Sequence, residues 1–195
     1  TRGVQRISAG AAIAGLVFTP FAVYAAPQGG VVVGGSASIV ATSVSRTDIN
    51  QQTNSAIIDW TSFSIAPQEH VNFNQPSSGA STLNRVLGND PSSLLGRLTA
   101  NGTVLLVNPN GILFGAGSRI DVSGLVATTA NIANADFLAG NYRFSEASPI
   151  AGASVVNQGN IRIADRGLAA LVAPWVSNSG LIQARLGRIA LAGAQ

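Results

Sequence analysis

The sequence predicts an all-β chain that winds as a parallel β-helix, and three observations predict it. Short apolar stretches alternate with turns that contain Gly, Asn or Pro, which is typical of short, regularly spaced strands. The chain holds 22 Gly among 195 residues, enough for many turns. Near the C-terminus, similar residues recur 21 positions apart. These pairs are Asn157 and Asn178, Gly159 and Gly180, and Ile161 and Ile182.

The repeat continues as Gly167 with Gly187 and Leu171 with Leu191, each 20 residues apart. Such a period with strand-like content indicates a solenoid whose rungs stack on one another. A leucine-rich repeat is the alternative, but it needs a regular leucine scaffold that these units lack. We therefore expect two or three short strands per rung. Residues 188–192 resemble a rung in progress, so the solenoid is expected to continue beyond this chain.

Composition excludes several classes of site. Charged residues make up only 10% of the chain, and the eleven basic residues are all Arg. Beyond residue 25, nine Arg face eight acids, so no basic stripe indicates a nucleic-acid partner. The absence of Cys excludes disulfides and thiolate metal sites.

The first 25 residues have the layout of a secretory signal peptide. Arg2 and Arg6 precede a mostly apolar stretch, 7–23, and small residues then surround a cleavage position. We expect cleavage after Ala25, with cleavage after Ala26 as the alternative. A short membrane anchor is a second alternative, but Gly and Pro interrupt the stretch, which is barely long enough to span a bilayer. Residues 26–195 are then the exported domain.

The region from 26 to 100 is less regular and is expected to form an N-terminal cap. Segments 29–41 and 53–63 predict strands that cover the first rung and protect its edge. Segment 77–91 predicts turns around an apolar patch at 83–87. Segment 92–98 predicts a short helix with Ser92 as its N-cap. The β-helix rungs are expected over roughly 101–195.

The run from Val104 to Thr129 carries the clearest local pattern. Its three short apolar stretches are separated by the turns 108–111 and 115–118. Pro presets the backbone of a turn, and Asn and Gly tolerate the conformations that follow. Beyond this run, segment 131–148 departs from the strand rhythm. It predicts an excursion whose aromatic residues, Phe137, Tyr142 and Phe144, pack back onto the solenoid.

From about residue 49 onward the chain resembles the N-terminal secretion domain of filamentous-haemagglutinin-type exoproteins, the two-partner secretion family. The resemblance rests on an ordered set of motifs, of which NPNGILFG at 108–115 is the most specific. The others are Asp59-Trp60, Phe63-Ser64-Ile65, Val71 to Pro76, Leu83 to Val86, Leu95 to Leu98 and Ala100-Asn101-Gly102.

The resemblance implies a right-handed parallel β-helix with an N-terminal cap and no catalytic role. It also implies a partner, an outer-membrane β-barrel transporter whose periplasmic domains recognise this domain. The chain would pass outward unfolded and fold at the surface of a Gram-negative bacterium, where it stays or is released. The full exoprotein would be an adhesin, a biofilm protein, a cytolysin or an iron or haem acquisition protein, with host or matrix ligands bound downstream. The domain is expected to be monomeric.

The residues that the resemblance singles out have two interpretations. They are either elements that the transporter recognises or residues that build turns, with amide side chains bonded to nearby backbone groups. Many family members carry a separate NPNL motif upstream, and this chain lacks it, which leaves open which upstream residues the transporter reads. The candidates are Asn108, Pro109, Asn110, Gly111 and Ile112, with Asn84 and Arg85 upstream.

No catalytic, cofactor or metal site is expected. His70 is the only histidine, with Glu69 beside it, and a solvated loop is its preferred interpretation because catalytic sites bring several ionisable groups together. The acids are scattered, and Asp121 and Asp165 are expected to face solvent. A polysaccharide-acting β-helix enzyme is thus disfavoured, whereas haem or glycan binding through Tyr142 or Phe144 remains an alternative. Trp60, Trp175, Phe63 and Phe73 are expected to pack in the core or the cap.

Overall fold

The computed structural model describes residues 25–193 of the chain. Apart from Ala25, the expected signal peptide lies outside these residues. Within the described part, no helix is long and apolar enough to cross a membrane.

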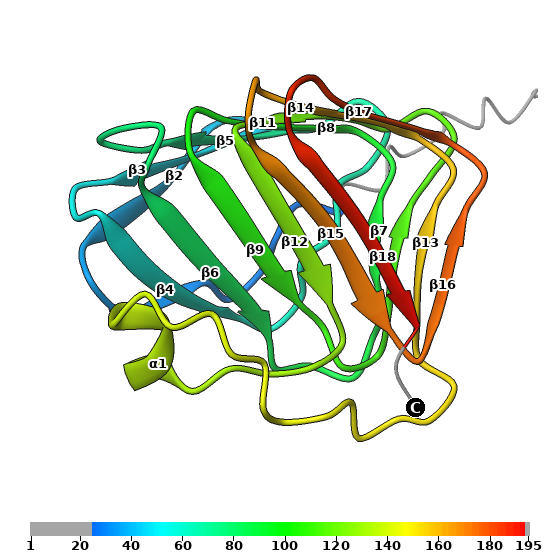
Figure 1. The fold of residues 1–195 in the computed structure, drawn as a ribbon. Helices are drawn as coiled ribbons and strands as arrows, with labels where there is room; N and C mark the ends of the chain where they lie inside the picture. The colour runs from blue at the N-terminus through cyan, green and yellow to red at the C-terminus, as the bar shows by residue number, and fades with distance from the viewer. Residues whose placement is uncertain (1–24, 194–195) are drawn as a thin grey trace, which may run out of the picture.

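The chain winds through three sheets, which form the faces of a β-solenoid (Figure 1). The top sheet runs β17–β14–β11–β8–β5–β3–β2, the front sheet runs β1–β4–β6–β9–β12–β15–β18, and the short sheet runs β16–β13–β10–β7. The top strands are Ala37–Ser43 (β2), Arg46–Gln51 (β3), His70–Asn74 (β5), Arg97–Ala100 (β8), Arg119–Val122 (β11), Asn160–Ile163 (β14) and Leu181–Ala184 (β17). The front strands are Val31–Gly34 (β1), Ser55–Trp60 (β4), Ser81–Val86 (β6), Thr103–Val107 (β9), Gly124–Thr128 (β12), Leu168–Ala173 (β15) and Arg188–Gly193 (β18). The short-sheet strands are Ser92–Leu94 (β7), Ile112–Phe114 (β10), Ser154–Asn157 (β13) and Trp175–Asn178 (β16).

Each complete rung takes one strand from the short, the top and the front sheet in turn. The rung β10–β11–β12 stacks on β7–β8–β9 through parallel pairs in all three sheets. The predicted repeat is the length of one turn, since Asn157 pairs with Asn178 and Ile161 pairs with Ile182. The 20-residue spacing also holds, because Leu171 pairs with Leu191. The parallel β-helix predicted from these spacings is confirmed.

The N-terminal cap is antiparallel. β1 pairs with β4, and β2 pairs with β3, so β1 and β2 cover an edge of the parallel stack, as expected for segment 29–41. Segment 53–63, also expected in the cap, instead contains β4, which pairs in parallel with β6. Parallel pairing already begins at β3 with β5 and at β4 with β6. Rung-type stacking therefore starts near Arg46, well before residue 101. The period is hard to see here because polar residues occupy buried positions, among them Gln51, Thr82 and Asn84.

Two local expectations between residues 77 and 98 are wrong. Segment 81–86, expected within a turn-rich stretch, is strand β6 in the front sheet. Segment 92–98 forms no helix, because Ser92 to Leu94 pair in parallel with Ile112 to Phe114. A helix of one or two turns is only marginally stable on its own. The hydrogen bonds that pair this segment with β10 therefore outweigh the stability that an N-cap at Ser92 would add.

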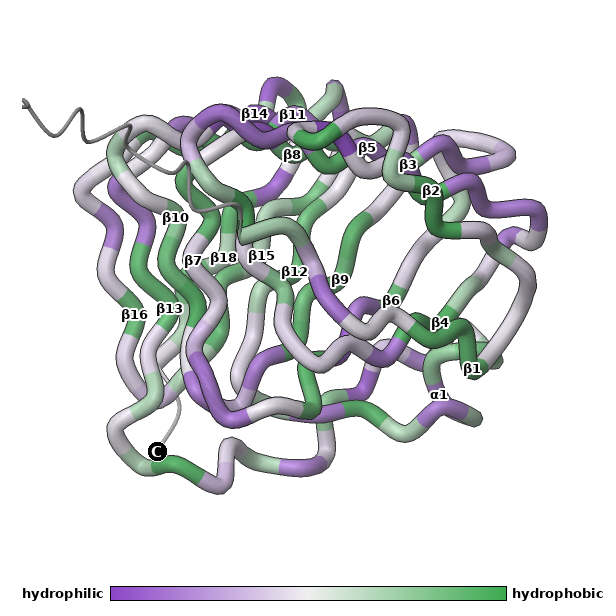
Figure 2. Tube along the Cα trace, turned by 180° about the vertical axis from the view of Figure 1, so that it is seen from behind, coloured by the Kyte–Doolittle hydropathy of each residue, from purple (hydrophilic) through white to green (hydrophobic). Residues whose placement is uncertain are grey.

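Apolar side chains from all three sheets fill the interior. Trp60, Phe63 and Phe73 are buried as expected, and the first two rings meet edge to face. Trp175 instead is 64% exposed, because it shares the outward position of Ser154 in the neighbouring rung. Figure 2 shows hydrophobic stretches on β9, β10 and β13, whereas hydrophilic stretches follow β5, β11 and β14 of the top sheet.

The first part of the excursion between β12 and β13 packs on the outer face of the front sheet, and the rest runs along the lower ends of its strands toward β13 (Figure 1). It contains the only helix in the described part of the chain, α1 (Asn134–Leu138). Phe137 is buried against Ile57, Leu83 and Leu105, and Phe144 packs on the same cluster. The expected packing of these two rings is confirmed.

Candidate recognition site at a rung corner

The NPNGI segment forms the corner that leads from β9 to β10. Asn108 follows β9 and is fully buried. Its Nδ2 donates to the carbonyl of Asp90 at 3.0 Å and to Ser92 Oγ at 2.9 Å. Its Oδ1 accepts from the backbone N–H of Asn110 at 2.9 Å, which is the amide-stabilised turn expected from the residues. Asn108 therefore joins its own corner to the corner of the preceding rung.

Asn110 reinforces this connection. Its Nδ2 donates to the carbonyl of Gly88 at 2.8 Å, again in the preceding corner. Gly111 closes the turn at φ +114°, a conformation that L side chains rarely adopt. Its N–H donates to the carbonyl of Asn108 at 3.1 Å. Ile112 then begins β10 with its side chain in the core.

Asn84 lies inside strand β6 rather than at a turn, so the turn interpretation is wrong for it. Its side chain is buried beside Trp60, whose Nε1 donates to Asn84 Oδ1 at 3.1 Å. Asn84 Nδ2 donates to the carbonyl of Leu105 at 3.3 Å. Asn84 thus satisfies the buried indole N–H and links β6 to β9.

Arg85 also lies in β6, and its side chain faces the excursion. Its Nε donates to Asn131 Oδ1 at 2.8 Å, and its Nη2 donates to the carbonyl of Ile132 at 2.9 Å and to Asn134 Oδ1 at 2.8 Å. Its Nη1 pairs with Asp59 at 3.2 Å, with both side chains mostly buried. One guanidinium therefore holds the first residues of the excursion on the front sheet. The amino-acid sequence carries no local signal for this contact, because the partners in the excursion are 46 or more residues away from Arg85.

The structure brings three of the seven candidate residues to one cleft of about 520 Å³. Arg85, Pro109 and Asn110 line it, and Leu87, Glu146 and Ile150 complete its walls. Asn84 does not reach this cleft, because its amide contacts Trp60 and the backbone of β6 and β9. Four of the seven candidates are buried, so the folded domain presents only part of the motif. They are Asn84, Asn108, Gly111 and Ile112.

His70 lies in β5 and not in a loop, so that expectation is wrong. Its Nε2 lies 2.7 Å from Thr99 Oγ1, whose own hydrogen is donated to Asn72. His70 therefore donates through Nε2, and its Nδ1 faces Arg46. The pKa of His70 is lowered chiefly by burial, and the positive charges of Arg46 and Arg97 lower it further. The imidazole is thus one member of a polar ladder that runs from Arg46 in β3 to Thr99 in β8.

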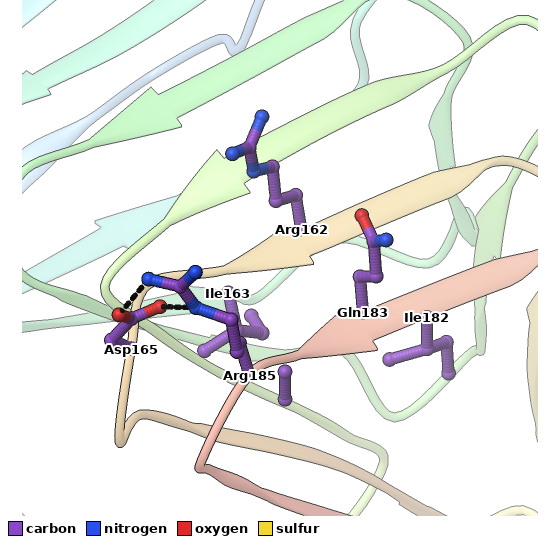
Figure 3. Close-up of a pocket in the computed structure, with 7 residues that line it drawn as sticks. Arg162, Ile163, Asp165, Ile182, Gln183 and Arg185 are labelled. Atoms are coloured by element: carbon purple, nitrogen blue, oxygen red, sulfur yellow. Dashed lines mark hydrogen bonds and ion pairs between the residues drawn. The ribbon is translucent and has the colours of Figure 1, made fainter.

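The scattered acids do not converge. Within residues 25–193, no group of three or more His, Asp or Glu side chains could hold a metal ion. Asp121 and Asp165 face solvent as expected. Figure 3 shows the cleft between the last two rungs, where Arg185 pairs with Asp165 beside Arg162. The hydrogen bond from Arg185 lowers the pKa of Asp165, and the charges neutralise each other. The charged side chains that line this cleft form an ion pair and do not form a general acid and base for catalysis.

Fold and site together define a capped β-solenoid domain whose motif is built into a corner. A family model described as the TPS secretion domain matches residues 23–195. The chain belongs to this family of two-partner secretion domains, which is not an enzyme family.

Solved structures and curated relatives agree with this assignment. The HMW1 secretion domain from Haemophilus influenzae matches with TM-score 0.80 and 36% identity, over 85% of this chain and 44% of that chain. The filamentous hemagglutinin secretion domain matches with TM-score 0.51 and 19% identity over 87% and 63%, which supports the fold alone.

Two curated relatives are named heme/hemopexin-binding proteins of Haemophilus influenzae. One is 40% identical over 119 residues, which are 61% of this chain and 13% of the relative. The second, from strain ATCC 51907 / DSM 11121 / KW20 / Rd, is 44% identical over 106 residues, which are 54% and 12%. The chain thus matches only about an eighth of each relative's length.

Proposed function

We propose that this domain directs a long exoprotein through a dedicated outer-membrane β-barrel transporter, and that it nucleates folding of the solenoid afterwards. The transporter would recognise the chain in the periplasm of a Gram-negative bacterium, before the rungs form. The exoprotein would then be released or kept at the cell surface. Family membership supports the export role, and the short share of its relatives that the chain matches supports a longer protein.

The burial of Asn108 carries the proposal. Every polar atom of its side chain is used inside the solenoid, and none of it is exposed. A transporter can contact this amide only in a chain whose corner has not yet formed. The same residues then have two successive roles, recognition in the extended chain and turn formation in the folded one. Extended chains can bind by adding a strand to a sheet edge, which suits this order of events.

The solenoid offers a surface for further rungs. In the described part, β16, β17 and β18 each pair with a strand on one side only. Trp175, Leu181, Ile189 and Leu191 are about half exposed or more in this last rung. Stacking of downstream rungs would bury part of this apolar surface, and the free energy released would favour outward movement of the chain.

Ligand binding by the excursion has less support. Tyr142 is half exposed, but its hydroxyl lies 2.9 Å from Ser81 Oγ and its ring packs near Phe137. These contacts fasten the excursion to the front sheet and use the side chain that a haem or a glycan would need.

The test compares two buried asparagines in cells that make the transporter. Asn108→Ala alters the motif, and Asn157→Ala alters an equally buried corner amide outside it, which bonds Gly159 and Asn178. We expect export to fall in the first variant and to persist in the second, with similar losses of stability measured by urea unfolding. Equal loss of export in both variants would reduce the motif to a folding element.

A binding assay checks the order of events. The transporter's purified periplasmic domains should bind the urea-unfolded chain, freshly diluted, more tightly than the folded domain. Tighter binding of the folded domain would contradict recognition before folding.

A further inference from the structure

Glu69 is a buried acid that the export proposal does not use. It lies directly before β5 and is only 3% exposed. Its Oε2 accepts from the backbone N–H of Ala66 at 2.7 Å. Its Oε1 accepts from the N–H groups of Ala25 at 3.0 Å and Ala26 at 3.2 Å. The carboxylate therefore joins the start of the described chain to the stretch that leads into β5.

The charge of Glu69 has no partner in the described part of the chain. The three ion pairs there are Arg46–Asp48, Arg85–Asp59 and Arg185–Asp165. A buried carboxylate without a cation is costly, and hydrogen bonds from neutral amides offset only part of that cost. A cation placed against Oε1 would therefore be bound favourably.

The segment that Glu69 holds covers one edge of the short sheet. Gln28, at its other end, exchanges backbone hydrogen bonds with Thr61 and Ser62. The segment 25–28 thus runs antiparallel to 62–69. On its other side, the stretch 62–69 pairs through Ile65 with Leu94 of β7. Contact with Glu69 therefore closes an edge that the β1 and β2 caps leave open.

We propose that Glu69 is the binding site for the α-ammonium group that signal-peptide cleavage creates at Ala26. Cleavage after Ala25 converts the Ala26 nitrogen from an amide into an ammonium, 3.2 Å from Oε1. A hydrogen bond from a neutral group then becomes an ion pair, which is stronger. Cleavage of the signal peptide thereby strengthens the contact that closes the N-terminal edge. The unprocessed chain keeps a buried, unpaired charge there, so its first rungs are less stable.

The composition allows a direct test, because the chain has no Lys and the α-amine is its only amine. The full chain is processed in the periplasm of an expression host, and mass spectrometry identifies its first residue. Acetylation then removes the charge and leaves an N–H at Ala26, as in the precursor. We expect acetylation to lower the urea midpoint of the wild type and to leave that of Glu69→Gln unchanged. An equal shift in both proteins, or none in the wild type, overturns the proposal, as does a first residue other than Ala26.

A second measurement needs no variant. An ion pair with Glu69 raises the pKa of the α-amine, and each unit lowers its reactivity near pH 7 about tenfold. The acetylation rate of the folded wild type should thus be at least about tenfold below that of the urea-unfolded chain. The difference between the acetylation rates of the folded and the unfolded chain should shrink as the pH rises past the pKa of the amine. Equal rates in both states overturn the proposal.

Discussion

The side-chain amide of Asn110 donates to the carbonyl of Gly88 at 2.8 Å, across 22 residues of sequence. This bond joins two consecutive corners of the solenoid, and the buried amide of Asn108 makes a parallel connection to Asp90 and Ser92. The NPNGI segment therefore fixes the geometry of one rung against the next.

Replacement of Asn108 should be more damaging than replacement of Asn110. Asn108→Ala leaves the buried hydroxyl of Ser92 and the carbonyl of Asp90 without this donor and should cost about 2–3 kcal/mol. Asn110→Ala removes a partly exposed bond and should cost about 1 kcal/mol. Urea unfolding measures both losses. Asn89→Ala, at an exposed position of the neighbouring corner, is the control and should change little. The opposite ranking would contradict the role given to burial.

Gly111 should not tolerate a side chain. A Cβ there would lie 3.0 Å from the carbonyl oxygen of Ser154, and φ is +114°. Gly111→Ala should therefore destabilise the domain by about 1–3 kcal/mol, seen as a lower thermal midpoint. Gly152→Ala is the matched control, since nothing lies within 4 Å of its Cβ position. Equal midpoints in the two variants would argue against a strained turn.

Loss of the Arg85 guanidinium should release the excursion. Arg85→Met keeps an apolar stem and removes every bond to Asn131, Ile132 and Asn134. Hydrogen exchange should accelerate over 131–148 and stay slow in β9 and β12. Arg143→Met, at an exposed position, serves as the control. Unchanged exchange in Arg85→Met would mean that the Phe137 cluster alone holds the excursion.

Stability should fall as the pH drops from 7 to 5. The folded state lowers the pKa of His70 below its ordinary value of 6.5. Below pH 6.5 the unfolded chain therefore binds a proton that the folded chain binds less readily, which favours unfolding. Stability is complete above this window. The pKa of Asp48 is also lowered, chiefly by its hydrogen bond from Arg46, but its contribution is lost only in more acidic solution.

His70→Gln tests this assignment. Glutamine can still donate to Thr99, and it does not titrate. The variant should lose most of the change in urea midpoint between pH 7 and pH 5. An unchanged pH dependence would place the titration elsewhere in the chain.

Predictions made from local sequence patterns were confirmed where the rungs of the solenoid are regular. The 21-residue repeat predicted the pairing of Asn157 with Asn178, because in-register stacking places equivalent residues beside each other. Local pattern was misleading at 92–98, where a favourable N-cap residue predicted a helix but β10 supplied strand partners. It also missed the first rungs, because their interior holds polar residues such as Gln51 and Thr82.

The β-solenoid and the NPNGI turn could be predicted from the order of the amino acids, since they follow from periodicity and turn chemistry, and the packing of Phe137 followed from its apolar ring. The burial of Asn108, the hold of Arg85 on the excursion and the position of Glu69 against Ala26 are visible only in the folded chain. Each of these depends on residues that the winding of the chain brings together from distant positions. Local pattern does not encode such contacts, because the stacking of successive rungs creates them.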